Sequence, residues 1–234
     1  MNRFMLLVGM GTALIAAGAC QDKPDTPLAA AAARNDVEEL RRLLAAGHSP
    51  DDSGDALTPL IWAARTGAID AMTALLDAGA DVDARGRSRL QWTPLQHAIH
   101  RRETGAARLL LERGADPNAS SSPGSLTPLL MAAADPDPTI VKLLLTCGAN
   151  PRIGGEYGET PLTQAVSGGA LSDLDRPLLG GCRLATVRAL LERDPELKIP
   201  DTYAGRSAIW WARFHGCADV LATVGAHAGQ RAKS

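Results

Sequence analysis

Aromatic side chains are scarce in this sequence: Phe, Trp and Tyr together make up 3% of its 234 residues. The hydrophobic share is nonetheless 45%, and much of it is Ala and Leu. Such a composition does not suit a sheet built on aromatic and β-branched side chains. It favours helices that pack closely through small residues. We therefore expect an all-α fold.

The sequence also lacks a marked excess of charge of either sign. Its formal net charge is −2 and its isoelectric point is about 6.2, so nothing in the overall charge predicts nucleic-acid binding. Neither H-E-x-x-H nor G-x-S-x-G occurs, and the glycine pairs lack the strand and the lysine of a phosphate-binding loop. We expect no catalytic residue, no metal and no cofactor.

The first twenty residues differ from the rest. Arg3 is followed by an uncharged run as far as Cys20, and the last part of that run consists of Ala and Gly. This pattern is typical of a secretory signal peptide, here residues 1–19. It is short and rich in Gly and Ala for a permanent transmembrane helix. A buried N-terminal helix is the alternative interpretation.

The sequence Ala-Gly-Ala-Cys at residues 17–20 resembles the bacterial lipobox, in which the cysteine carries diacylglycerol. The lipobox prefers Leu where this chain has Ala17, and the same residues also satisfy the A-x-A rule for ordinary signal cleavage. We expect Cys20 to be lipidated, with residues 20–25 as a short tether. The residue after the cysteine is Gln21 rather than Asp, which resembles lipoproteins routed to the outer membrane. This resemblance implies a location in the bacterial periplasm.

A repeated segment follows. "TPLIWAARTGAIDAMTALLDAGADVDA" begins at Thr58, a similar segment begins thirty-five residues later at Thr93, and a third begins thirty-four residues after that at Thr127. Threonine is a good N-cap, and proline is favoured at the first position of a helix. Glycine after the second apolar stripe is typical of a helix end. Each unit is therefore predicted to be a pair of helices.

These units resemble the ankyrin repeat, whose signature is T-P-L-H-x-A at a period of about 33 residues. The resemblance covers residues 26–228 and implies an ankyrin-repeat solenoid of about six helix-turn-helix units joined by β-hairpin-like loops. Residues 229–234 would form a flexible tail. We expect repeats to start near residues 26, 58, 93, 127, 160 and 207.

Repeat five is longer than the others because of an insertion at about residues 170–183. Its leucines either fold back onto the solenoid or contact a partner. The insertion carries Cys182, and Cys217 occupies the corresponding turn of the next repeat in the ankyrin layout. Neighbouring repeats lie about 10 Å apart, and a flexible inserted loop could close that gap to disulfide distance, so we expect a Cys182–Cys217 disulfide. We expect Cys147 to be a buried free thiol.

Ankyrin proteins usually bind partners through the hairpin tips and the residues just after the small pair of the first helix. Arg clustered with Trp is typical of interface hot spots, although a solvated charged surface is the alternative. Trp62, Trp210 and Trp211 lie on expected first helices, and Trp62 and Trp211, which occupy the same place in their repeats, are expected to pack between repeats. The residues predicted by position to contact a partner are Arg65, Thr66, Arg85, Arg87, Arg89, Trp92, His100, Arg101, Glu156, Tyr157, Glu159, Tyr203 and Arg206.

The resemblance to exported ankyrin proteins implies a non-catalytic, envelope-anchored protein-binding module that is monomeric when free. The first hypothesis is an immunity-type protein that neutralises a periplasmic or membrane-attacking toxic effector with an acidic patch. The second is an accessory protein for an envelope or stress-defence enzyme. Two other hypotheses are a small-ligand or haem carrier using His97, His100 and the tryptophans, and an enzyme built around Cys182 in the repeat-five loop.

Overall fold

The computed structural model describes residues 23–54, 57–87, 91–121, 126–168 and 181–229. Within these ranges the chain forms twelve α-helices, no strand and one isolated antiparallel bridge, between Ser121 and Leu126. The helices form six successive pairs: α1 (Pro27–Ala33) with α2 (Val37–Ala45), α3 (Pro59–Thr66) with α4 (Ile69–Asp77), α5 (Pro94–Arg101) with α6 (Thr104–Glu112), α7 (Pro128–Ala132) with α8 (Thr139–Thr146), α9 (Pro161–Ser167) with α10 (Leu184–Arg193), and α11 (Tyr203–Phe214) with α12 (Ala218–Gly229).

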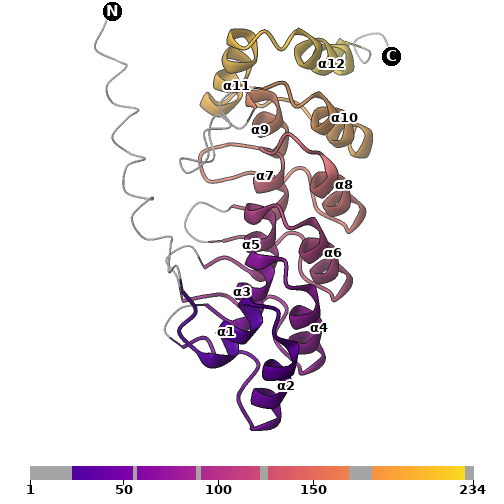
Figure 1. Cartoon of the computed structure of the whole chain (residues 1–234). Helices are drawn as coiled ribbons and strands as arrows, with labels where there is room; N and C mark the ends of the chain where they lie inside the picture. Colours follow the sequence, from indigo (N-terminus) through magenta and orange to yellow (C-terminus); the bar gives the residue numbers. More distant parts are fainter. Residues whose placement is uncertain (1–22, 55–56, 88–90, 122–125, 169–180, 230–234) are drawn as a thin grey trace, which may run out of the picture.

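The pairs stack along one axis to form a solenoid (Figure 1). The first helices of the pairs lie in one column and the second helices in a parallel column, and the long inter-repeat loops project beside the first helices. The predicted all-α repeat architecture is confirmed. None of the helices in the described ranges combines the length and the hydropathy that a membrane crossing would require.

The threonines of the repeated motif start the first helices as the sequence predicts. The side-chain oxygens of Thr26, Thr58 and Thr127 each accept a hydrogen bond from the backbone N–H three residues later, and a proline follows each of them. Thr93 and Thr160 do the same within full capping boxes. Capping satisfies backbone donors that a helix start leaves unpaired.

The start of the sixth repeat is corrected by the structure. The predicted start near Ser207 lies inside α11, which begins at Tyr203 and is capped by Thr202. A Cβ added to Gly205 would clash with the carbonyl oxygen of Pro200, so only glycine lets this first turn lie against the preceding loop. The extra turn makes α11 longer than the other first helices.

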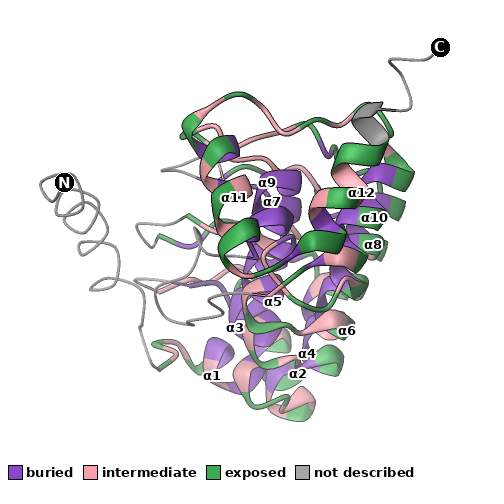
Figure 2. Ribbon diagram, turned by 90° about the horizontal axis from the view of Figure 1, so that it is seen from above, coloured by how far each residue is buried: buried purple, intermediate pink, exposed green. Residues whose placement is uncertain are grey.

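The core lies between the two columns of helices (Figure 2). It is built from leucines and small residues: Leu60 and Leu95 on first helices and Leu75 and Leu110 on second helices are fully buried. Each fully buried leucine contributes on the order of 2 kcal/mol of hydrophobic stabilisation. The few aromatic residues are therefore not needed to fill the core.

The loops that follow the second helices are joined by side-chain hydrogen bonds, which we call the loop ladder. The carboxylate of Asp51 accepts from the backbone N–H of Asp81 at 3.1 Å, and that of Asp83 accepts from the N–H of Asp116 at 3.1 Å. Asn118 Oδ1 then accepts from the N–H of Asn150 at 2.8 Å. Each acceptor lies one repeat before its donor, so the ladder ties successive repeats together.

The ladder changes character after repeat four. There the next contact is an ion pair between Arg152 Nε and Asp194 Oδ2, 2.5 Å apart. Asp194 stands where the other repeats have the helix-ending glycine, and its φ of −140° is extended rather than left-handed. The regular succession of glycine-ended helices therefore stops at α10.

The last two repeats are joined by a disulfide between Cys182 and Cys217, whose Cα atoms are 5.3 Å apart. Arg183 is also buried there: its Nε donates to the carbonyl oxygen of Ala134 and its Nη2 to that of Gly168. Burial lowers the pKa of this guanidinium, and the carboxylate of Asp135 opposes that shift. Most of the predicted insertion, residues 170–180, lies outside the described residues.

The prediction that Cys147 is buried is wrong, because its side chain is exposed. Cys147 is the C-cap of α8, one residue beyond the helix. The residues that turn inward at this level are Leu144 and Ala149, both of which are buried.

Candidate protein-binding face

The candidate site lies on the first helices of repeats two and three and on the loop between these repeats. We define the basic cluster as the arginine, tryptophan and histidine residues among the predicted contacts of this region that the structure describes. Its members are Arg65, Arg85, Arg87, Trp92, His100 and Arg101.

Two tryptophans organise the basic cluster. Trp62, 6% exposed on α3, lies under Arg65, whose guanidinium carbon is 4.7 Å from the ring centroid. Trp92 immediately precedes the cap of α5, and its ring lies 5.3 Å from that of His97 and 5.1 Å from that of His100. A cation over an indole face is attracted by the negative face of the ring. The Trp62 ring therefore holds the Arg65 guanidinium in a defined position, and the Trp92 ring contacts both histidine rings.

His97 lies beneath this surface. Its side chain is buried, and burial lowers its pKa to about 3, helped by the positive charges of Arg65, His100 and Arg101. The imidazole is consequently neutral at physiological pH. Its Nε2 atom is buried without a hydrogen-bond partner, as is Nε1 of Trp62 in the equivalent position of the preceding repeat. Buried polar atoms without partners are uncommon in folded proteins.

The loop before α5 contributes two more arginines. Arg85 donates from Nη1 to the carbonyl oxygen of Gln91 at 3.1 Å, across the loop that precedes Trp92. Gln91 has a φ of +48°, a left-handed conformation that bends the chain into the first turn of the repeat. Arg87 is exposed. Arg89, which was also predicted to contact a partner, lies outside the described residues, as does Cys20.

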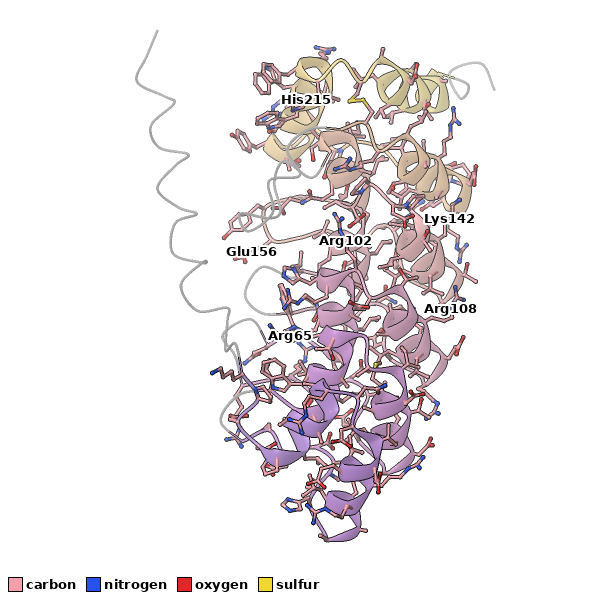
Figure 3. The ribbon with its side chains drawn as sticks, in the orientation of Figure 1. Arg65, Arg102, Arg108, Lys142, Glu156 and His215 are labelled. Atoms are coloured by element: carbon pink, nitrogen blue, oxygen red, sulfur yellow. A yellow bond between two sulfur atoms is a disulfide. The ribbon has the colours of Figure 1, made fainter. Side chains whose placement is uncertain are left out.

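The remaining predicted contact residues do not join the basic cluster. Thr66 is exposed, but its hydroxyl donates to the carbonyl oxygens of Trp62 and Ala63 in its own helix. Glu156 projects from the loop before repeat five, on the same side as Arg65 (Figure 3). Glu159 is half-buried, and its carboxylate accepts from the backbone N–H of Tyr157 at 3.1 Å.

Two predicted contact residues lie at the C-terminal end. Tyr203 begins α11 and is 70% exposed, and Arg206 makes an ion pair with Asp201 at 2.6 Å. The expectation that Trp62 packs between repeats holds, because it is buried together with Ala29 of repeat one. Trp211 is only half-buried and contacts the rings of Trp210 and Phe214 in its own helix, and Trp210 is 54% exposed.

Two residues with structural importance have no counterpart in the sequence prediction. Arg102 has a φ of +63° where other repeats have glycine, and its Nε lies 2.5 Å from Oδ2 of Asp135 on the next repeat. Asn35, with a φ of +57°, accepts from the N–H of Ala71 at 2.9 Å. An alignment of the repeats places Asn35 and Arg102 at the position of Gly67, and this alignment would have indicated that both residues adopt a left-handed backbone conformation.

Within the described ranges, no three His, Cys, Asp or Glu side chains form a group that could hold a metal ion. The small hollow lined by Gly148, Asn150 and Asp194 lies at the loop ends, away from the basic cluster. The geometry instead offers an extended surface of guanidinium groups and rings. Such a composition is typical of protein interfaces.

Comparisons with known proteins agree with this architecture. The family described as "Ankyrin repeats (3 copies)" matches residues 5–86 and 28–121. The chain is 35% identical over 198 residues to an ankyrin repeat and KH domain-containing protein of Caenorhabditis briggsae, covering 80% of this chain and 7% of that protein. It is 32% identical over 123 residues to an ankyrin repeat-containing protein of Treponema pallidum, covering 52% of this chain and 41% of the relative.

A third similarity is to the B-cell lymphoma 3 protein homolog of Mus musculus, 35% identical over 117 residues, covering 48% of this chain and 25% of that protein. The chain spans less than half the length of each of these relatives. The chain belongs to the ankyrin-repeat family. Ankyrin repeats generally mediate protein–protein interactions, and proteins built from them are typically non-catalytic binding modules.

Proposed function

We propose that this chain is a non-catalytic module that binds another protein through the basic cluster, and that its role is of the immunity type. In this role it binds a toxic effector that acts in the periplasm or on the membrane, and blocks its activity. The observation that carries the binding proposal is the arrangement of Arg65 over Trp62 and of Trp92 against two histidine rings. Preorganised arginine and tryptophan side chains are the residue types that dominate interface energies.

The charge of the cluster supports a partner with an acidic surface. Arg65, Arg85, Arg87 and Arg101 lie on adjacent elements, and neutral His97 beneath them adds no charge at physiological pH. An acidic patch on the partner would complement this surface and accelerate association by electrostatic steering. The alternative role, an accessory protein for an envelope or stress-defence enzyme, uses the same surface and differs in whether the bound enzyme stays active.

The proposed location is the bacterial periplasm, with Cys20 lipidated and the protein attached to the outer membrane. This proposal rests on the signal-like sequence of residues 1–19 and on the lipobox resemblance. Mass spectrometry of the mature N-terminus tests it: a diacylglyceryl group on Cys20 is expected in the membrane fraction. An unmodified Cys20 in a soluble fraction would contradict the anchor.

Charge reversal tests the binding proposal. Tagged protein is purified from its native cell envelope as wild type, as Arg65→Glu with Arg101→Glu, and as Arg108→Glu with Lys142→Glu. The last two residues are exposed on α6 and α8, on the other side of the solenoid (Figure 3), so this control changes charge equally. We expect the control to keep the partner and the Arg65/Arg101 variant to lose about a hundredfold in affinity.

The activity of the recovered partner separates the two roles. A hydrolase that is inactive in the complex and active when released establishes the immunity role. An enzyme that keeps its activity establishes the accessory role. Equal recovery by the two charge-reversed variants would place the interface elsewhere.

A further inference from the structure

The face of α11 that points away from the core is aromatic. Tyr203, Trp210 and Phe214 recur at the spacing of one helix face, and they are 70%, 54% and 67% exposed. The opposite face is made only of small residues: Ala204, Gly205, Ala208 and Ala212 are buried. The helix therefore packs through its small side and leaves its large apolar side chains outward.

These rings are packed against one another before any partner arrives. Trp210 stacks on Phe214 with centroids 5.3 Å apart, and Trp211 meets Trp210 edge-on at 5.0 Å. Ring contacts of this kind restrict side-chain motion, so little conformational entropy remains to be lost on binding. An apolar face that is rigid and exposed is suited to recognition.

The patch continues into the loop before repeat five. Tyr157 is 75% exposed, and its neighbour Gly158 lies against Thr202, the cap of α11. A Cβ added to Gly158 would lie 3.5 Å from the threonine side chain, which is ordinary van der Waals contact. Of the large exposed hydrophobic side chains in the described part of the chain, only Ile69 lies outside this end of the solenoid. Exposed apolar surface is thus concentrated here.

Charge along α11 indicates what the patch binds. Arg206 and Arg213 border the aromatic stripe on one flank, and α11 contains no acidic residue. Arg206 is paired with Asp201 just before the helix, but both side chains of this pair are exposed, and such surface pairs contribute little. A second copy of this chain would bring arginine flanks together, which is unfavourable. Binding to anionic lipid through charge typically uses four to eight basic residues, more than this helix provides. An acidic polypeptide with apolar side chains satisfies both the rings and the arginines.

We propose that the outward face of α11, formed by Tyr203, Trp210 and Phe214 and bordered by Arg206 and Arg213, is a second docking site for an acidic amphipathic segment of a partner protein. The apolar side chains of that segment lie on the rings, and its carboxylates face Arg213 and compete with Asp201 for Arg206. This site is separate from the basic cluster and does not depend on it.

Site-specific photocrosslinking in the native cells tests the proposal. A photoactivatable benzoylphenylalanine replaces Phe214, and in a control chain it replaces Lys142, which is exposed on α8. We expect position 214 to yield one protein adduct whose crosslinked peptide is rich in Asp, Glu and apolar residues. Position 142 is expected to yield no such adduct. Crosslinks to lipid, to a second copy or to a basic segment, or no crosslink at all, would overturn the proposal.

The crosslinked peptide is then synthesised and its binding to the full chain measured by fluorescence. Trp210→Ala and Arg213→Glu should each weaken binding at least about tenfold while the melting temperature stays unchanged, because both side chains are exposed. Trp210→Phe should restore most of the affinity. Arg65→Glu with Arg101→Glu should leave peptide binding unchanged, so a failure of the proposed function is distinguishable from a failure of this site. Unchanged binding in Trp210→Ala would refute the assignment.

Discussion

Repeats two to four and repeats five and six solve the same packing problem differently. In the middle of the solenoid, each unit has the same capped first helix, and a side-chain hydrogen bond joins its loop to the loop of the next unit. At the C-terminal end, an ion pair, a disulfide and a buried arginine take over. A regular stack is stabilised by equivalent neighbours. The difference shows that an irregular unit needs specific bonds to stay in the stack.

The largest expected effect comes from breaking the disulfide. Cys182 and Cys217 are 35 residues apart in sequence, and a cross-link of that span stabilises by about 3–4 kcal/mol, chiefly by restricting the unfolded chain. Cys217→Ser should lower the free energy of unfolding by up to that amount in urea denaturation. Cys147→Ser is the matched control, since that thiol is free and exposed, and should change nothing measurable. Equal stability of both variants would show that the C-terminal repeats need no covalent link.

Acid should destabilise the middle of the solenoid through His97. Its folded pKa of about 3 lies below the ordinary value near 6.5, so the unfolded state binds the additional proton between these pH values. Stability is complete above pH 6.5 and falls by about 1.4 kcal/mol per pH unit below it, or about 2 kcal/mol at pH 5. His97→Met gives repeat three the residue type that repeat four has at the equivalent position, Met131. This substitution should remove the acid-dependent loss of stability.

Urea denaturation at pH 7 and pH 5 measures the difference between the wild type and His97→Met. His48→Gln serves as the control because His48 is exposed, and it should keep the acid sensitivity of the wild type. If His97→Met and the wild type lose the same stability on acidification, His97 is not the cause.

A smaller loss of stability is expected when a contact between loops is removed, and its size should differ between the loop ladder and the Arg152–Asp194 ion pair that follows it. Asn118→Ala removes the acceptor for the N–H of Asn150 and should cost about 1 kcal/mol. Arg152→Ala breaks the ion pair with Asp194, in which the arginine is 58% exposed, and should cost less than that. Chemical denaturation measures both. A larger loss in Arg152→Ala would mean that the ion pair, rather than the hydrogen bond, is the stronger link.

Much of the fold could be predicted from the sequence because its determinants are local. Thr58 with Pro59, and the glycines that end the second helices, act within a few residues of themselves. The start of α11 was missed because Thr202 is followed by tyrosine rather than proline. The outward face that exposes Trp210 can be recognised only when the helix is taken to begin at Tyr203.

The candidate site was predicted in composition but not in arrangement. Arg65, Trp92 and His100 follow from position in the repeat, whereas the contact of Trp92 with His97 depends on how the loop bends at Gln91. The role of Asp83 in joining repeats depends on a backbone N–H more than thirty residues away, which no local pattern encodes. Long-range contacts of this kind require the assembled stack.

The loop ladder also determines where this chain can change length. Each rung between Asp51 and Asn150 links a donor and an acceptor that occupy equivalent places in neighbouring units. A copy of repeat three inserted after itself would therefore find matching partners on both sides, and the solenoid could grow by a whole unit. Repeat five has no such freedom, since its bonds to repeats four and six are made by residues that occur once. Gene duplication can extend the middle of this molecule, while its C-terminal end stays as a fixed terminus.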